Sequence, residues 1–243
     1  MYNALKGQFF MNNPKKIGII GAMKCETDAL KAMMTGAMTE TISGIEYVSG
    51  SLAGIHAVVA TCGVGKVAAA VCAQTMILRY APNAIINTGV AGSLSEKLGV
   101  LDVAVSADTV EHDMDTTVLG DPAGLISGLN IIKIPADKNL AKTATETAES
   151  LGIKSILGTI ASGDSFVCDA NVKRRIRDNF GAVACEMEGA SIGHVCYMNE
   201  TPFVVIRAIS DGGDDEVAMT YDKFAPIAAE NSVKIILGML DKI

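Results

Sequence analysis

Residues 15–23 read KKIGIIGAM: two lysines, then a β-branched apolar run that ends in small residues. This pattern predicts a buried strand followed by a turn, and the apolar spacing after it predicts a helix from near Glu26 to Met34. Strands and helices alternate in the same way along the rest of the chain. This alternation indicates an α/β domain with a largely parallel sheet.

Further elements follow from short apolar runs and from glycine or proline punctuation. The expected strands are 45–52, 55–62, the strand and glycine-rich exit at 84–93, 101–107, 155–161, 182–185 and 203–209. The expected helices follow CGVGK and EME, and also occupy 136–151, 171–179 and 223–241. Periodicity is weak over 108–138, which indicates a long loop of the kind that is usually functional or at an interface.

Composition restricts the class of protein. Of 243 residues, 49% are hydrophobic and 19% are charged, which suits a large core and excludes a disordered chain. Residues 1–14 are interpreted as a tail and 15–243 as one domain. The net charge of -7 argues against a nucleic-acid groove or a basic membrane-binding patch. Neither a signal peptide nor a membrane span is expected.

The cysteine and histidine content bears on metals and on location. The six cysteines form no C-x-x-C pair, and there are only three histidines, so we expect no metal site and no cofactor. Free thiols in apolar surroundings are typical of a reducing cytoplasm, where we expect the protein to act.

Candidate site residues lie where strands end, because ligands of α/β sheets bind at the carboxyl ends of the strands. The informative exits are GAMKCE, TCGVGK, NTGVAGS, ASGDSF, CEMEGA and IRAISDGG. Taken alone, the glycine turns match neither a dinucleotide fingerprint nor a phosphate-binding P-loop. Three exits carry a carboxylate at the same expected edge of the sheet, namely Glu26, Glu188 and Asp211.

Asp211 follows an apolar run interrupted only by Arg207, with Ser210 beside it. Burial there would raise the pKa of the carboxyl and suit it to acid catalysis, although an aspartate in this place is also a good helix N-cap. Glu186 and Glu188 flank the start of a helix, where acids often serve only the helix dipole. The coincidence of three carboxylates on one edge favours a site.

Together, these exits resemble the 5'-methylthioadenosine/S-adenosylhomocysteine nucleosidase family of the purine nucleoside phosphorylase-like superfamily. The matching motifs are KIGIIGAM-x-x-E, CGVGK, NTG-x-AG, SGD-x-F, EME-G-A and RAISD, in one order from residue 15 onward. The resemblance implies a three-layer α/β/α fold with a central mixed sheet that partly closes as a barrel. It also implies a cytoplasmic homodimer that hydrolyses 5'-thio-substituted adenosines to adenine and a thioribose, with 5'-deoxyadenosine as a further candidate substrate.

The resemblance also implies roles for individual residues. Glu26 would be the base for the attacking water, and Asp211 the acid that protonates adenine N7. Glu188 would hold the ribose hydroxyls, with Met187 along the sugar. Phe166 would stack on adenine.

Other implied contacts complete the substrate site. The backbone of Val167 would bind the adenine edge, Arg207 would help Glu188 to place the water, and Ser210 would steady Asp211. The remaining substrate-binding residues come from the matched motifs: Met23, Val64, Val90, Ala91 and Gly92.

Two departures from the family pattern stand out. Val90 occupies a position where some members carry a serine that helps to hold the water. The loop after His112 and Asp113 lacks aromatic residues, so Leu119 is the expected apolar contribution to a partner subunit's pocket. The uncharged helix AAAVCAQTMIL and this loop favour a homodimer. A lone histidine such as His112 is more often structural than catalytic.

Four alternatives remain open. A phosphorylase on the same fold needs fixed cations for phosphate, which GAMKCE and NTGVAGS lack. A futalosine-type N-ribosidase uses a similar pair of carboxylates, so the sequence separates it poorly. A binding protein without turnover would not need both Glu26 and Asp211. A nicotinamide oxidoreductase is disfavoured by the missing fingerprint.

Overall fold

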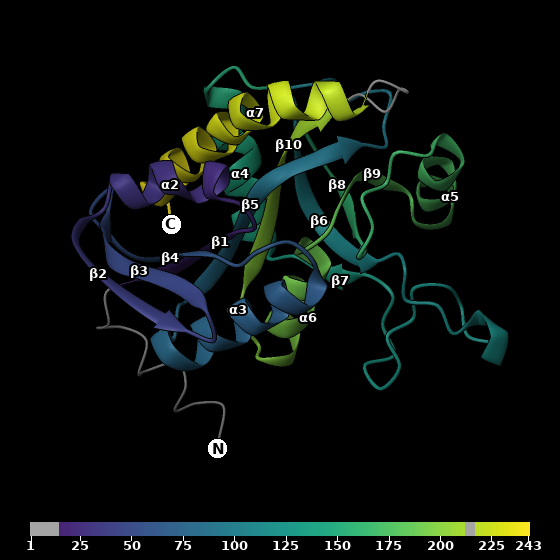
Figure 1. Ribbon diagram of the computed structural model, residues 1–243, viewed down its shortest axis with the longest axis horizontal. Coiled ribbons are helices and arrows are strands. Elements are labelled where there is room, and N and C mark those ends of the chain that lie inside the picture. The colour runs from purple at the N-terminus through teal and green to yellow at the C-terminus, as the bar shows by residue number, and fades with distance from the viewer. Residues whose placement is uncertain (1–14, 212–216) are drawn as a thin grey trace.

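A ten-stranded sheet forms the centre of the molecule (Figure 1). The computed structural model describes residues 15–211 and 217–243, without the side chains of 211 and 217–223, so the predicted tail at 1–14 lies outside the described residues. The strands are β1 (Lys16–Gly21), β2 (Thr35–Ile42), β3 (Ile45–Leu52), β4 (Ile55–Thr61), β5 (Ala84–Ser93), β6 (Val103–Glu111), β7 (Ile134–Pro135), β8 (Ser155–Ser162), β9 (Ala182–Glu186) and β10 (Phe203–Asp211).

The sheet closes on itself at one end. Its order is β10-β6-β8-β9-β5-β1-β4-β3-β2, β7 pairs with β6, and β10 pairs with β5 as well. Strands β5, β9, β8, β6 and β10 therefore form a closed barrel, and β1 to β4 extend from it as an open sheet. The mixed, partly barrel-like sheet that the family resemblance implies is confirmed.

The largely parallel sheet predicted from the strand and helix pattern is correct only in part, since β1 pairs in parallel with β4 and β5 but half of all the described pairings are antiparallel. Strands β5 and β10 run parallel to each other, as do β6, β8 and β9, but the two groups are joined by the antiparallel pairs β5–β9 and β6–β10. Strands β2, β3 and β4 are also antiparallel. A buried apolar run has the same composition in either direction, so the pattern carries no information about strand polarity.

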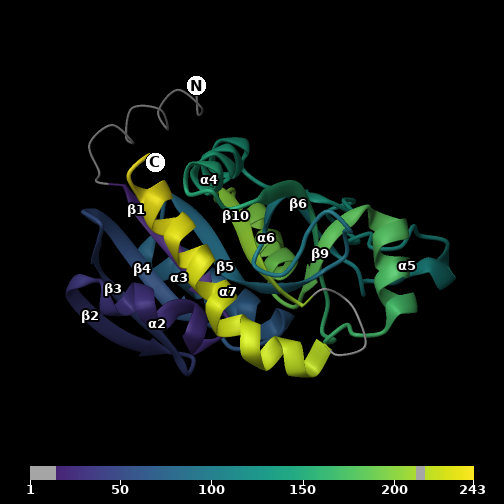
Figure 2. The ribbon, with the colours of Figure 1, turned by 90° about the horizontal axis from the view of Figure 1, so that it is seen from above.

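Helices cover both faces of the sheet (Figure 2). The helices are α2 (Lys24–Ala32), α3 (Lys66–Tyr80), α4 (Lys138–Ser150), α5 (Ala170–Phe180), α6 (Gly189–Met198) and α7 (Val217–Leu240). Helices α2, α4 and α7 share one core cluster with Ile19, whereas α3 and α6 share the other with Ile20. Neighbouring residues of β1 thus point into opposite cores, which explains why this strand is apolar without alternation.

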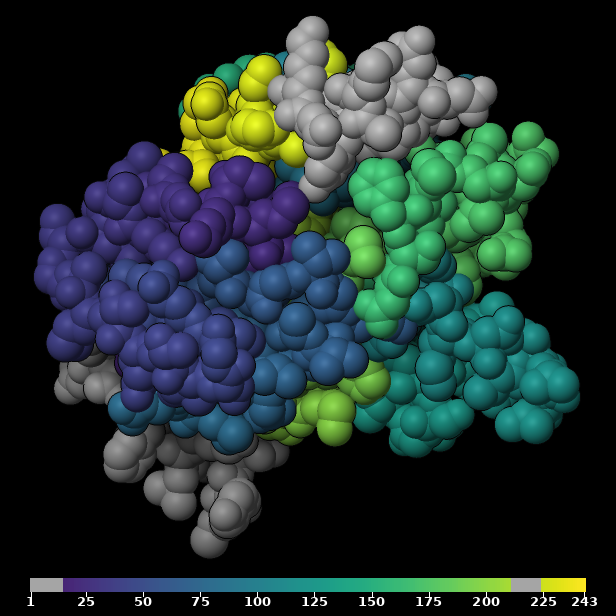
Figure 3. Space-filling model, in the orientation of Figure 1, coloured from purple at the N-terminus to yellow at the C-terminus, as the bar shows by residue number. Residues whose placement is uncertain are grey.

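Two segments differ from a simple alternation of strands and helices. Strand β2 escapes sequence prediction because its side chains are mostly exposed, and it forms by pairing along β3. The predicted loop over 108–138 contains the end of β6, the short 3-10 helix η1 (Thr117–Leu119) and β7. Its outer part stands away from the body (Figures 1 and 3), with Val118 91% and Leu119 79% exposed. None of the described helices is long and apolar enough to cross a membrane.

Candidate active site

A pocket of about 380 Å³ opens at the carboxyl ends of the barrel strands, where the strand exits were predicted to meet. Of the predicted site residues whose side chains the structure describes, all line it except Arg207. Four further lining residues were not assigned a role from sequence: Ala22, Ser165, Cys185 and Glu186. The motifs separated in sequence are therefore brought together in one site.

Arg207 and Asp211 are described separately. Arg207 is fully buried beneath the pocket, where it contacts the carboxylates that line it. Asp211 is the last residue of β10 and pairs with Gly92 of β5, but its side chain lies outside the described residues. Neighbouring Ser210 is buried in the pocket wall and donates to the carbonyl oxygen of Ala91 at 3.4 Å.

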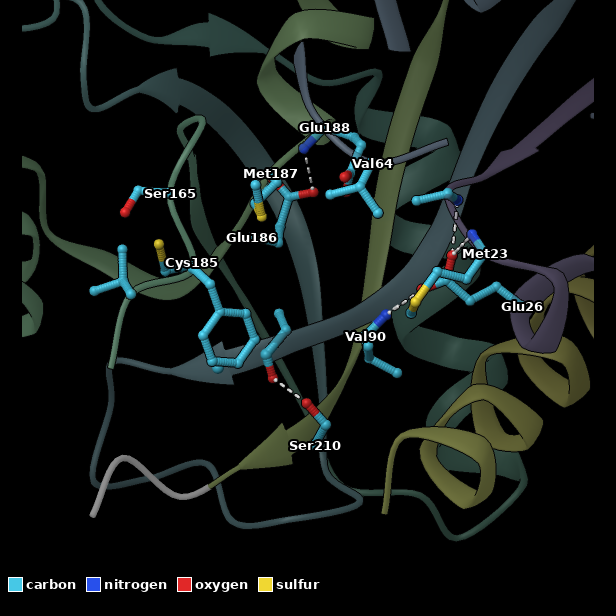
Figure 4. Close-up of a pocket in the computed structure, with 15 residues that line it drawn as sticks. Met23, Glu26, Val64, Val90, Ser165, Cys185, Glu186, Met187, Glu188 and Ser210 are labelled. Carbon is cyan, nitrogen blue, oxygen red and sulfur yellow. Dashed lines mark hydrogen bonds between the residues drawn. The ribbon is translucent and has the colours of Figure 1, made fainter. Parts of the chain in front are cut away.

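Glu26 lies in the first turn of α2 with its carboxylate folded back toward β1 (Figure 4). Its Oε2 accepts from the amides of Ala22 and Met23 at 2.7 and 2.9 Å, and its Oε1 accepts from the amide of Val90 at 3.1 Å. Burial raises the pKa of this carboxyl, although Arg207 and the three amides oppose the effect. The strand exit and the helix start thus fix a buried carboxylate with a strong affinity for a proton.

Glu188 stands directly before α6 and is 5% exposed. Its Oε1 accepts from the amide of Gly65 at 3.0 Å, and its Oε2 lies 3.5 Å from Nη2 of Arg207. Gly65 has φ of +100°, a conformation that side chains disfavour, and this turn aims its amide at the carboxylate. Burial and the charge of Glu186 raise the pKa of Glu188 to about 7.

Glu186, at the end of β9, is the buried carboxylate whose part in the site sequence reasoning missed. It accepts hydrogen bonds from Nη2 of Arg207, from Oγ of Ser162 and from the amides of Glu188 and Gly189. The EME motif was the available sign, but a first-turn acid has an ordinary explanation in helix capping.

Arg207 joins three barrel strands. Nη1 donates to the Thr88 carbonyl oxygen at 2.9 Å, while Nη2 donates to Oδ1 of Asn87 at 2.6 Å and to Glu186. Burial alone would lower the pKa of Arg207, but the surrounding carboxylates outweigh it and raise the pKa. A Cβ at Gly89 would overlap Nη1 of Arg207 and lie 2.7 Å from Oε1 of Glu26, so only glycine fits there.

The outer part of the pocket is more open. Val64 is 56% and Phe166 52% exposed. The loops that carry them are tied together by Asp164, whose Oδ1 accepts from the Lys66 amide at 2.7 Å and whose amide donates to Asp113 at 2.9 Å.

His112 and the cysteines complete the description of the predicted groups. His112 is part-buried, and burial lowers its pKa. Its Nε2 lies 3.7 Å from Sγ of Cys185 in the pocket wall, so it supports the site from behind rather than lining it. Among the described residues, no group of three or more His, Cys, Asp or Glu side chains is arranged to hold a metal ion.

Comparison with known proteins places this geometry in a family. A family model described as the phosphorylase superfamily matches residues 16–241. A relative from Shewanella putrefaciens, named 5'-methylthioadenosine/S-adenosylhomocysteine nucleosidase, is 40% identical over 230 residues, which cover 94% of this chain and 99% of the relative. The chain belongs to the 5'-methylthioadenosine/S-adenosylhomocysteine nucleosidase family. The resemblance inferred from the motifs is confirmed, and with it the prediction of an N-ribosyl hydrolase.

Solved structures of family members superpose closely on this one. The nucleosidase from Neisseria meningitidis in complex with methylthio-immucillin-A has a TM-score of 0.91 at 35% identity, covering 94% of this chain and all of that one. The futalosine hydrolase of Helicobacter pylori has a TM-score of 0.90 at 34% identity, covering 94% and 98%. Proteins named for different substrates therefore share this architecture.

Proposed function

We propose that this protein hydrolyses the N-glycosidic bond of 5'-methylthioadenosine and S-adenosylhomocysteine, and of the related 5'-deoxyadenosine, releasing adenine. One observation carries the proposal: a pocket of about 380 Å³ has three buried carboxylates in its wall, Glu26 and Glu188 among them, and the end of β10 at its edge. That volume suits a nucleoside-sized ligand. The names of the relatives support the same reaction.

The proposed chemistry divides acid and base work between two carboxyl groups. Asp211 donates a proton to adenine N7, which makes the base a better leaving group. Glu26 accepts a proton from the attacking water, and its burial raises its pKa toward the range in which a general base is effective. The bond breaks through an oxocarbenium-like state, whose positive charge carboxylates near the sugar stabilise.

Binding groups hold the substrate for this step. Glu188 accepts hydrogen bonds from the ribose hydroxyls, with Met187 along the sugar, and Phe166 stacks on adenine. The backbone of Val167 binds the adenine edge. Arg207 orients the water through Glu188, since the arginine itself lies beneath the pocket wall.

Three residues from the remaining exits, Met23, Val64 and Val90, contribute apolar surface, and the backbone at Ala91 and Gly92 lies against the ligand. Val90 has no hydroxyl, so in this proposal the water depends on Glu26, Glu188 and Arg207. The amide of Val90 holds Glu26 instead, at 3.1 Å.

Phosphorolysis is the less favoured reaction on this fold. Among the described residues that line the pocket there is no lysine or arginine, and the buried Arg207 is already paired with Glu186. A phosphate nucleophile would meet Glu26 and Glu188 without a cation to offset their charge. A water molecule meets no such repulsion.

Adenine release from 5'-methylthioadenosine in phosphate-free buffer, and then with added phosphate, tests the proposed reaction. Release without phosphate and unchanged by its addition is expected. Release only with phosphate would make the enzyme a phosphorylase. The same assay with futalosine addresses the second candidate, which the structural similarity to futalosine hydrolase favours; turnover of futalosine alone would replace the nucleosidase proposal.

A cytoplasmic homodimer is part of the proposal. Exposed apolar side chains lie on α3, on α6 and on η1. They are Val67, Val71 and Leu78 on α3, Tyr197 and Met198 on α6, and Val118 and Leu119 on η1. Patches of this kind on one chain are typical of subunit contacts. Leu119 is then the residue that reaches a partner's pocket. A mass by light scattering that stays that of one chain at all concentrations would contradict the dimer.

A further inference from the structure

Glu186 lines the pocket, yet the proposed reaction gives it no task. It is 7% exposed and accepts from four groups: the hydroxyl of Ser162, the guanidinium of Arg207 and the amides of Glu188 and Gly189. These donors come from β8, β10 and the start of α6. The carboxylate is thus the point at which three separate elements meet beneath the pocket.

The contacts of Arg207 are unequal. Its Nη2 donates directly to Glu186, whereas Oε2 of Glu188 lies 3.5 Å from the same nitrogen. Asn87 and Thr88 of β5 hold the other side of the guanidinium at 2.6 and 2.9 Å. The cation is therefore held beside Glu188 without being its primary partner.

We propose that Glu186 is a positioning residue: it fixes the Arg207 guanidinium beneath the pocket and satisfies most of its charge, so that Arg207 offsets the charges of Glu26 and Glu188 only in part. The proposal rests on the proposed function, in which Glu26 must take a proton and Glu188 must accept hydrogen bonds from the ribose. With Arg207 committed to Glu186, both of these carboxylates stay available to the substrate and the water.

The charged and titratable groups around Glu186 support this division. Arg207 approaches from β10, Glu188 from the start of α6, and Glu26 from α2 is coupled electrostatically to Arg207 and Glu188. His112 follows β6. Burial lowers the pKa of its imidazole, and the charge of Glu186 opposes this effect. Among the described residues around the pocket, the guanidinium of Arg207 thus interacts with all three carboxylates.

A purely structural role is the competing explanation. Glu186 caps two amides at the start of α6, and Ser162 links it to the amide of Ala190 at 2.7 Å. A cap needs an acceptor oxygen but no charge, whereas balancing Arg207 needs the charge. Glu186→Gln therefore separates the two roles, because glutamine keeps an acceptor oxygen and loses the charge.

The experiment is the pH dependence of kcat/KM for adenine release by wild type and Glu186→Gln. Loss of the charge lets Arg207 act more strongly on Glu26 and Glu188 and removes the repulsion between Glu186 and Glu188. Both effects lower the pKa of these carboxyls, so the acid limb of the profile is expected to move about one pH unit lower. Ser162→Ala, which removes a donor to Glu186 but no charge, is the matched control and should leave the limb where it is. An unmoved limb in Glu186→Gln, or an equal movement in Ser162→Ala, would overturn the proposal.

Glu186→Asp covers the case in which the glutamine variant does not fold. Aspartate keeps the charge but is one methylene shorter, so it loosens the hold on Arg207. We expect kcat/KM to fall on the order of 100-fold with the acid limb unmoved; a wild-type kcat/KM would overturn the proposal. Absence of adenine release by the wild-type protein would instead refute the proposed function, so the two failures are distinguishable.

Discussion

The floor of the pocket and its rim differ in burial and in the number of contacts that hold their side chains. The floor consists of Glu26, Glu186, Glu188 and Arg207, each less than a tenth exposed and each held by contacts from several elements. The rim is formed by Val64 and Phe166, both more than half exposed. The buried charges are thus fixed by contacts among strand ends, whereas the exposed apolar side chains stand on loops, which change readily without disturbing the scaffold.

The largest effect is expected when one of the two proposed proton-transfer groups is neutralised. Glu26→Gln, and Asp211→Asn at the end of β10, are each expected to lower kcat by about 10²–10⁴-fold, because each removes a proton-transfer group. Binding of a nucleoside analogue, measured by calorimetry, should persist. Glu46→Gln is the matched control, since that carboxylate is 54% exposed and pairs with Lys31 on the surface. Near-wild-type turnover in either variant would assign the proposed role to another residue.

Close packing of the floor is tested by Gly89→Ala. The added methyl would overlap Arg207 Nη1, so we expect a loss of at least about 1–3 kcal/mol of unfolding free energy and a fall in activity. Gly99→Ala is the control, because its Cβ meets Asp102 at an ordinary 3.7 Å. The free energy of unfolding of both variants is measured in urea. Equal values would mean that the floor has room for the added methyl group.

The buried charge of Glu188 should be visible in the pH dependence of stability. The pKa of this carboxyl is raised from 4.5 to about 7, so between these values the folded protein holds a proton that the unfolded chain releases. Stability therefore falls as pH rises through this window. Relative to wild type, Glu188→Gln should gain on the order of 2–3 kcal/mol across the window, measured by urea unfolding. A constant difference at all pH values would contradict the shift.

The smallest effect is expected at the rim. Phe166→Ala removes a stacking surface, so KM should rise about tenfold with kcat and stability nearly unchanged. Leu151→Ala, at a similarly exposed apolar residue beyond α4, should change neither parameter. A large loss of kcat in Phe166→Ala would show that rim and floor are not separate in function.

Much of the fold and of the pocket could be predicted from the chain. After Lys16, the run IGIIG is apolar because both of its faces are covered, and this is visible in the sequence. Strand polarity was not predictable, since the junctions β5–β9 and β6–β10 depend on barrel closure and on no local pattern. Strand β2 was missed because pairing with β3, rather than burial, creates it.

In the pocket, too, features set by local sequence could be predicted, whereas contacts between distant segments could not. Residues at glycine-rich exits were found because their motifs lie next to strands. Arg207 could be recognised in the sequence as the single charge within an apolar run. Its position beneath the pocket wall could not, because it results from the meeting of β5, β9 and β10. Glu186 was named only as a flank of Met187, because its link to Arg207 is a contact between distant segments.

Barrel closure also sets the order in which the molecule can be made. Strand β10 closes the barrel against β5, and Arg207 reaches Asn87 across 120 residues of sequence. During synthesis, β1 to β5 leave the ribosome long before β10, so the early sheet waits with one side of β5 unpaired. The contacts of Arg207 with Asn87 and Glu186 can form only after this strand is made. A nascent chain that stops before β10 therefore has the three amides that hold Glu26 but lacks Arg207 and Asp211, so the proposed activity requires the last sixth of the polypeptide.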